Sequence, residues 1–385
     1  MATRYFRRKS ILAKIETTYG TDAVPTGAAN AIVMRNVNFT PLEPEYADRD
    51  IARDYLGHSE QLVVSSKVAL SYEVELAGSG TAGTAPAWGP LARACGFGQT
   101  ILAAAHASTA QAGAASTITL AAAASAVDEA YRGMRIRTTG GTGTGQSRTI
   151  STYVGATKVA TVSEAWTTAP DVTTTYSIDA QVIYLPVSTG FEAVTKYFNM
   201  DAKRHNLLGV RGTMGLRLNS RSIPLLTFAF TGLFVTPTDT AFPTQVLTNW
   251  PKPLPVNNAN TSGFTLHGLA AKLYGLELDV ANEIIYRNLV GAEDVQLTDR
   301  APTGSATIED PTQAEKDYFT IVRNVTLGAM NLLHGTAAGN QVHIHAPAVQ
   351  LTAPAFEDRD GVIALKMGAR LVPNLGNDEL VIQVL

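Results

Sequence analysis

A glycine-rich stretch, residues 140–147 (GGTGTGQS), is the closest approach in this sequence to a nucleotide-binding motif. It differs by one residue from the phosphate-binding pattern G-x-x-x-x-G-K-[ST]. Gln146 stands where a lysine would reach the phosphates, and the residues after Ser147 alternate as in a strand, whereas a phosphate loop needs a following helix. We therefore expect a β-turn here and no nucleotide site.

A histidine pair and the single cysteine are the other candidates for chemistry. His343 and His345 would point to the same side of a strand, but the sequence suggests no third ligand, and catalytic zinc sites use three protein ligands. We expect exposed or interface histidines instead. Cys95 falls on the apolar stripe of a short predicted helix with no histidine beside it, which predicts a core thiol.

Other catalytic patterns are missing from the sequence. It contains no G-x-S-x-G nucleophile elbow and no H-E-x-x-H helix. Carboxylates gather in two charged stretches, but nothing in the sequence pairs them across a cleft. We therefore expect a protein that is not an enzyme, with no catalytic residue, no cofactor and no metal site.

Composition and charge limit the class of protein further. The chain has 385 residues, 45% of them hydrophobic, and 30 Lys+Arg against 33 Asp+Glu give a formal net charge of −3. Such a chain can bury a large core and has no electrostatic reason to bind nucleic acid or an anionic membrane tightly. One cysteine excludes an internal disulfide framework. The apolar run after the basic N-terminus is too short for a signal peptide, so we expect a soluble compartment before assembly.

The elements that would position any site are organised around one strand pattern that occurs twice. Residues 221–235 alternate bulky apolar side chains with smaller ones, which is the period of a β-strand. Residues 359–372 repeat this pattern, and a proline follows each copy. At a constant offset, the bulky positions Leu226, Phe228 and Phe230 correspond to Ile363, Leu365 and Met367. We infer that the core is duplicated.

Changes in composition divide the chain into three domains. Residues 101–180 are rich in Ala, Thr, Gly and Ser with repeated short strand signals, which predicts a small all-β insertion. A proline-rich linker at residues 236–263 separates the two core copies. The expected domains are residues 1–100 with 181–240, the insertion 101–180, and residues 241–385.

Each half is predicted to contain one short helix and one charged loop. The first helix is expected at residues 86–96, and the second begins with Asp310 as its N-cap. The loops are residues 43–60 and 281–298. A loop of this length between strands is either functional or disordered. Two interpretations remain open: a solvated loop, or an arm that docks on another copy through its charges.

Three segments and the duplicated strand resemble a known family. They are residues 15–45 (IETTYGTDAVPTGAANAIVMRNVNFTPLEPE), 53–57 (RDYLG) and 77–97 (AGSGTAGTAPAWGPLARACGF), and they resemble the major tail tube proteins of long-tailed, siphovirus-type bacteriophages. The resemblance implies a mainly β fold: a duplicated tail-tube domain, each copy with two packed antiparallel sheets plus a short helix, and a small all-β decoration domain inserted into the first copy.

The resemblance also implies a function and partners. The chain would be a structural virion protein, made in the bacterial host cytoplasm, that polymerises into stacked rings forming a conduit for DNA ejection. Its partners would be copies of itself, the tail terminator, tape measure and distal tail proteins, and phage DNA in the lumen, with no membrane. Two repeats per chain favour a trimeric, pseudo-six-fold ring over a hexamer. The alternative functions are a capsid or decoration protein and a β-sandwich surface adhesin.

Charged and aromatic residues in the N-terminal arm and the two loops are the expected contacts between subunits and rings. Such contacts would also cover strand edges that a single chain leaves unpaired. The candidates are Arg4, Arg7, Arg8 and Lys9 in the arm, Tyr46, Asp48, Arg49, Asp50, Arg53, Asp54 and Tyr55 in the first loop, and Asn288, Glu293 and Asp294 in the second.

Overall fold

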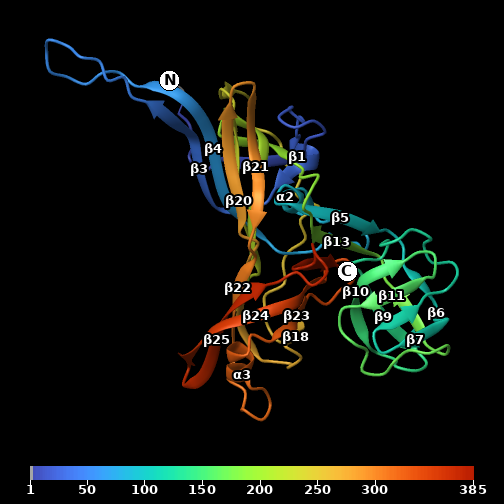
Figure 1. The fold of residues 1–385 in the computed structure, drawn as a ribbon. Coiled ribbons are helices and arrows are strands. Elements are labelled where there is room, and N and C mark those ends of the chain that lie inside the picture. The colour runs from blue at the N-terminus through green and yellow to red at the C-terminus, as the bar shows by residue number, and fades with distance from the viewer. Residues whose placement is uncertain (1–2) are drawn as a thin grey trace.

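The structure is a computed structural model that describes residues 3–385. Its elements are antiparallel strands and three short helices (Figure 1), which confirms the predicted mainly β class. Within residues 3–385, no helix has the length and apolar character that a membrane span requires.

Eight strands form one continuous sheet that runs through the centre of the molecule. Hydrogen bonds join them in the order β3-β4-β16-β15-β19-β22-β25-β24. We call the first four strands the first block and the last four the second block. The first block is β3 (Arg35–Ala47), β4 (Leu62–Glu75), β16 (Leu225–Phe234) and β15 (Lys203–Asn219), and the second is β19 (Leu273–Asp279), β22 (Thr303–Glu309), β25 (Val362–Leu371) and β24 (Val342–Arg359).

The two blocks are built in the same way along the chain. In each, a hairpin provides the first two strands, and the second hairpin strand pairs with a strand that the sequence pattern marked as central, β16 or β25. That strand pairs in turn with a long strand, β15 or β24. Along β16, Leu226, Phe228 and Phe230 are buried while Ala229 is exposed. The period-two pattern therefore points the bulky side chains of one sheet face into the core.

The long strands β15 and β24 connect the central sheet to a second layer. The first half of β15 pairs with β14 and that of β24 pairs with β23, each with a β-bulge before the strand continues into the central sheet. The other strands of this layer are β1 (Lys9–Ile15), β2 (Ala31–Ile32), β5 (Phe97–Leu102), β13 (Gln181–Pro186), β14 (Val194–Met200), β17 (Thr238–Asp239), β18 (Thr261–Leu266), β23 (Leu327–His334) and β26 (Val381–Val384).

Residues 106–178 form a separate sheet with its own apolar cluster, at one side of the molecule in Figure 1. The strands before and after this sheet, β5 and β13, pair with each other from Gln181 opposite Leu102 onward. The chain therefore leaves and re-enters the layer at adjacent points. The strand order is β6 (His106–Thr109), β12 (Thr175–Ile178), β9 (Arg135–Gly140), β10 (Ser147–Val154), β11 (Val159–Val162), β8 (Thr117–Thr119) and β7 (Ala112–Ala114).

The prediction that the two charged stretches are loops is wrong, because part of the first stretch and most of the second form strands. Strand β3 extends to Ala47, so only residues 48–61 of the first stretch form a loop. The second stretch is a hairpin of β20 (Asn282–Leu289) and β21 (Ala292–Arg300) that continues β19 and β22 beyond the sheet. Polar residues on the outer face of these ribbons obscured the strand pattern, because only one side of β21 is buried, at Val295 and Leu297.

The three helices are α1 (Gly27–Asn30), α2 (Gly89–Arg93) and α3 (Tyr318–Arg323). The predicted N-cap Asp310 is wrong: Asp317 caps α3, and its carboxylate accepts a hydrogen bond of 2.8 Å from the Thr320 amide. Tyr318, the first helical residue, is buried and donates its hydroxyl to Leu266 O, so a tertiary contact fixes where α3 begins.

A lysine lies inside the core of the first block. Lys196 on β14 is fully buried; its Nζ lies 2.8 Å from the Tyr72 hydroxyl and 2.8 Å from the centroid of the Phe230 ring. Burial holds the pKa of Lys196 well below its usual value. No ion-pair partner lies within reach of it among residues 3–385.

We expect this lysine to make stability depend on pH. Between the lowered pKa of the folded state and the unfolded pKa of about 10, the unfolded chain binds a proton at Lys196 that the folded chain does not, so the free energy of unfolding rises with pH across this window. Urea unfolding at several pH values should show this rise in the parent and a flatter profile in Lys196→Met. Lys14→Met, at an exposed position on β1, is the control. Equal slopes in the parent and Lys196→Met would contradict the assignment.

Candidate functional site: the uncovered sheet face, the hairpins and the open edges

One face of the central sheet is uncovered by other elements and carries small and charged side chains. On β16 this face presents Thr227, Ala229 and Thr231, and on β4 it presents Ser71 and Glu73. Bulky apolar residues of the same strands point to the core. The charged members of this face on the other strands are Arg217, Glu277, Asp279, Glu309, Lys366, Arg370, Glu357 and Arg359.

Ion pairs neutralise most of the basic side chains on this face. Arg217 reaches Glu73 at 3.6 Å on one neighbouring strand and Glu277 at 3.4 Å on the other. Lys366 and Arg359 both contact Glu357, at 3.5 Å and 2.8 Å. These pairs are partly exposed, so each adds little to stability. Their consequence is electrostatic: among residues 3–385, Arg370 is the one basic residue of this set without a carboxylate in ion-pair range.

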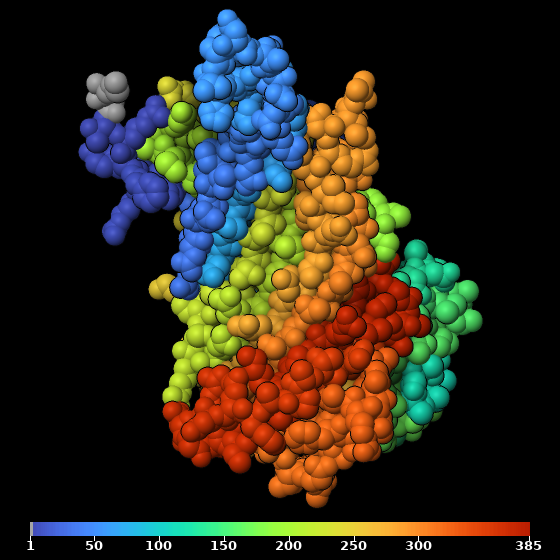
Figure 2. All heavy atoms as spheres, turned by 60° about the vertical axis from the view of Figure 1, so that its left-hand side comes forward, coloured from blue at the N-terminus to red at the C-terminus, as the bar shows by residue number. Residues whose placement is uncertain are grey.

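The first hairpin carries an exposed tip. Figure 2 shows this hairpin, in blue, projecting from one end of the molecule. Asp48 accepts a hydrogen bond of 2.6 Å from Gln61 across the base of the loop, and Arg49 pairs with Glu60. The Arg53 guanidinium lies 5.6 Å from the centroid of the Tyr55 ring. Tyr46, Asp50 and Asp54 are also exposed, so all the predicted contact residues of this hairpin are accessible.

The second hairpin, β20–β21, projects from the same end but packs on the first block along the way (Figures 1 and 2). Asn282 donates to Gly212 O of β15 at 2.9 Å, and Arg211 donates to Val295 O at 2.8 Å. Among the predicted contact residues, Asn288 and Glu293 are exposed at the tip, whereas Asp294 is half-buried and pairs with Arg287 at 3.6 Å.

Two of the predicted contact residues in the N-terminal arm have partners within the chain. Arg4 pairs with Asp239 at 2.8 Å, and Arg8 pairs with Asp201 at 2.8 Å. Lys9 begins β1, and its Nζ lies 3.6 Å from the centroid of the Phe6 ring. Arg7 is exposed. Intramolecular ion pairs thus hold the described part of this arm on the protomer.

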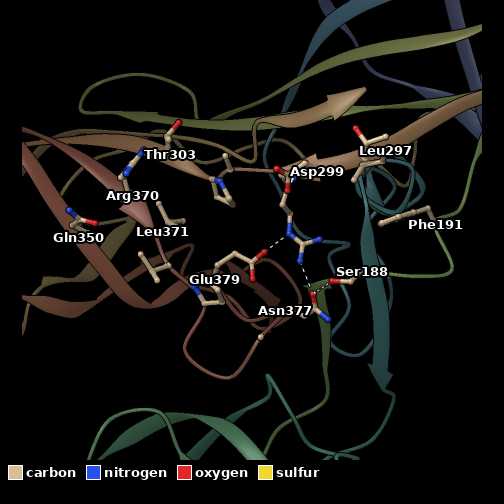
Figure 3. A pocket seen from close by; sticks show the side chains of 17 residues that line it. Ser188, Phe191, Leu297, Asp299, Thr303, Gln350, Arg370, Leu371, Asn377 and Glu379 are labelled. Atoms are coloured by element: carbon tan, nitrogen blue, oxygen red, sulfur yellow. Dashed lines mark hydrogen bonds and ion pairs between the residues drawn. The ribbon is translucent and has the colours of Figure 1, made fainter. Parts of the chain in front are cut away.

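A cavity of about 570 Å³ lies at the base of the second hairpin (Figure 3). Arg300 crosses it: the guanidinium pairs with the buried Glu379 and donates to Asn377 at 2.7 Å and to Val187 O at 2.6 Å. The apolar part of the wall includes Leu297. Arg300 therefore ties the hairpin base to the C-terminal segment.

The motifs that suggested chemistry have structural roles. Residues 140–147 form the turn between β9 and β10, with no helix after it, as predicted. Burial of Cys95 raises the pKa of its thiol, which agrees with the predicted core position. The alternative of exposed histidines is wrong: His343 and His345 are both buried beside the insertion, and burial lowers the pKa of His345 to about 4. No cluster of metal ligands occurs in the part of the chain that the structure describes.

Sequence reasoning did not locate the open edges of the central sheet. Strand β3 pairs with β4 alone, and beyond Gln350 strand β24 pairs with β25 alone, among the described residues. Near the second edge, Phe356 is 62% exposed and Ile363 is 59% exposed. The repeat alone gave no signal of this edge, because Ile363 matches Leu226, which is fully buried in the first block.

A family model described as "Phage tail tube protein" matches residues 7–370. No curated protein matches the chain.

We expect Arg300 to hold the second hairpin in place. Removing one partner of a buried ion pair leaves an uncompensated charge, so Arg300→Met should lower the free energy of unfolding by about 3 kcal/mol. Hydrogen exchange of β20 and β21 should increase with it. Arg370→Met is the matched control, because Arg370 lines the same cavity without an ion pair. Equal losses in the two variants would show that Arg300 has no special role.

Proposed function

Because the chain belongs to the phage tail tube protein family, and so is a structural component of the virion tail, we propose that it forms the tube as stacked rings of three chains. Each chain would supply two copies of a duplicated tube domain, so that a trimer has pseudo-six-fold symmetry. The tube would be of the siphovirus type and conduct phage DNA during ejection. Tail terminator, tape measure and distal tail proteins would be further partners.

The junction between the two blocks within one chain carries this proposal. Strands β15 and β19 pair antiparallel, with Arg217 opposite Glu277 and Asn219 opposite Gly275. In the repeat, β24 takes the place of β15 and β3 takes the place of β19. The open edges of β24 and β3 are therefore equivalent to the two edges that pair with each other inside the chain. A second copy would then continue the sheet, and repeating the contact would close it into a ring.

The register of the strands extends this correspondence to single residues. Arg217 lies opposite Leu225, and Arg359 lies opposite Val362, at the ends of the two long hairpins. By the same comparison, Thr40 on β3 takes the position of Glu277 on β19. The proposed contact between neighbouring chains therefore sets Arg359 opposite Thr40.

Apolar exposure supports the same contact. Phe356 takes the position of Met214, and Ile363 takes that of Leu226. Both first-block residues are buried, with at most 1% exposed surface, whereas both second-block residues are more than half exposed. An isolated chain would leave this apolar surface and the unpaired strand edge in water, which favours association. Pro41 on β3 would limit wrong edge pairings.

The uncovered sheet face would then line the lumen. Ring closure through β3 and β24 turns the eight-strand sheets of three chains into one wall, and the second layer and the insertion lie on its other side. Small side chains and paired charges on this face suit passage of DNA, since unpaired cations would bind phosphates. The exposed tips of the two hairpins project from one end of the sheet, so we assign them to contacts between rings.

Disulfide cross-linking tests the contact between chains and the copy number together. A double variant with Thr40→Cys and Arg359→Cys should form disulfides between neighbouring chains, because the proposed register sets the two positions opposite each other. Non-reducing gels of assembled tubes should show a ladder that ends at three chains for the trimer. A ladder that ends at six chains would replace the trimer with the hexamer.

Two controls make the cross-linking result specific. Thr40→Cys alone should not cross-link, because the natural Cys95 is buried. Thr40→Cys with Glu357→Cys shifts the pair along the strand and should cross-link poorly. Assembled tubes in which the shifted pair reacts as well as the first pair would rule out the proposed register.

Replacing the loop at residues 48–61 with an Asn-Gly turn tests the contacts between rings. The turn keeps β3 and β4 paired but removes the exposed tip with Asp48, Arg53 and Tyr55. We expect soluble rings that no longer stack, seen by electron microscopy, while the Thr40–Arg359 cross-link still forms. Tubes of normal length from this variant would exclude the first hairpin tip as a required contact between rings.

A further inference from the structure

A polar cavity of about 340 Å³ lies where the insertion meets the second layer beside the second block. The insertion contributes Arg135 and Arg148, and strands β23 and β24 contribute Asn331 and His343. Nothing in the proposed tube contacts requires charged groups here. The cavity is therefore a candidate site of its own.

Two guanidinium groups line this cavity without a carboxylate partner. Arg135 is half-buried and donates its Nε to Ser147 Oγ at 2.6 Å, and its terminal amino groups make no hydrogen bond to residues 3–385. Arg148 donates to Ala165 O at 3.0 Å and Thr167 Oγ1 at 3.2 Å. Within the described chain, no carboxylate lies in ion-pair range of either guanidinium. Positive charge that is removed from water needs a counter-charge.

The hydrogen bonds of His343 leave one ring nitrogen free. Gln383 donates its amide to Gly133 O at 2.6 Å, so its Oε1 accepts and the His343 Nδ1, 2.7 Å away, donates. The Nε2 of His343, on the side chain that lines the cavity, makes no hydrogen bond to the described residues. Burial first, then Arg135 and His345, hold the pKa of His343 well below its usual value.

One carboxylate also lines the cavity. Glu164 accepts a hydrogen bond of 2.9 Å from the Asn331 amide. Counting Arg135 and Arg148 against Glu164, the cavity has a charge of +1 with neutral His343 and +2 once His343 is protonated. These are the charges that match a monoanion and a dianion.

We propose that this cavity binds a small oxyanion, phosphate or sulfate, free or as the head of a larger molecule, and that the bound anion fastens the insertion to the second layer. Arg135 and Arg148 supply charged donors from the insertion, and Asn331 and His343 complete the site from the other side. Binding a dianion favours the protonated form of His343, so affinity rises as pH falls.

Calorimetric titration of the assembled full-length chain with sodium sulfate tests this site, because sulfate keeps its charge across the pH range. At constant ionic strength, sulfate should bind more tightly at about pH 6 than at about pH 8. Arg135→Gln should weaken binding about tenfold or more, and Glu164→Gln should strengthen it. Arg137→Gln is the matched control, since Arg137 lies on the same strand and pairs with Asp179 outside the cavity.

Three results would overturn the proposal: no saturable binding, equal affinity in the parent and Arg135→Gln, or equal losses in Arg135→Gln and Arg137→Gln. Tube formation by the variants shows that they fold. Titrations with sodium phosphate and glucose 6-phosphate distinguish the two sources of the anion. Weaker binding of the sugar phosphate supports a free ion, and tighter binding supports a phosphate carried by a larger molecule.

Discussion

The hydrogen-bonding demand of strand edges is the constraint on which the rest of this structure depends. Inside the chain, β15 and β19 satisfy each other and join two similar blocks into one sheet. The same type of edge stays open at β3 and along β24 past Gln350, in the described residues. In the proposed ring such edges must stay available, because the sheet of one chain would be only part of a wall. Phe356 and Ile363 are exposed apolar residues beside the β24 edge, so burying them would favour association in addition to the backbone hydrogen bonds.

The long strands explain how a sheet with open edges can still have a stable core. A single sheet cannot bury both faces, so β15 and β24 each pass through a bulge and continue into a second layer that covers one face. The insertion does not interrupt this arrangement, because the chain leaves the layer at β5 and re-enters it at β13, and these two strands pair with each other. Its attachment combines two kinds of contact. Gln383 and Asn331 bridge to the insertion through side-chain hydrogen bonds, and Ile183 and Val381 join its apolar cluster. An outer module could therefore be exchanged without rebuilding the core around Phe228 and Leu365.

The sequence allowed the mainly β class, the central strands and the turn at residues 140–147 to be predicted, because period-two burial and glycine positions are local signals. It misplaced the start of α3, since the choice of Asp317 over Asp310 as cap depends on Tyr318 reaching Leu266, a contact distant in the chain. The hairpin β20–β21 appeared to be a loop because most of its side chains face solvent. Open edges and the partners of His343 were beyond prediction for the same reason: both are defined by which distant segments pair, and by which do not.

The distribution of paired and unpaired cations separates two electrostatic roles in one chain. On the uncovered sheet face, Arg217 lies between Glu73 and Glu277, so carboxylates on both neighbouring strands balance its charge. A wall of this kind presents a passing polyanion with little that would hold it. At the insertion, Arg135 is half-buried and has no acidic partner in the described chain, so the proposed anion would supply its counter-charge. Arginine therefore has two electrostatic roles in this chain. Its role depends on whether a carboxylate lies on the neighbouring strand.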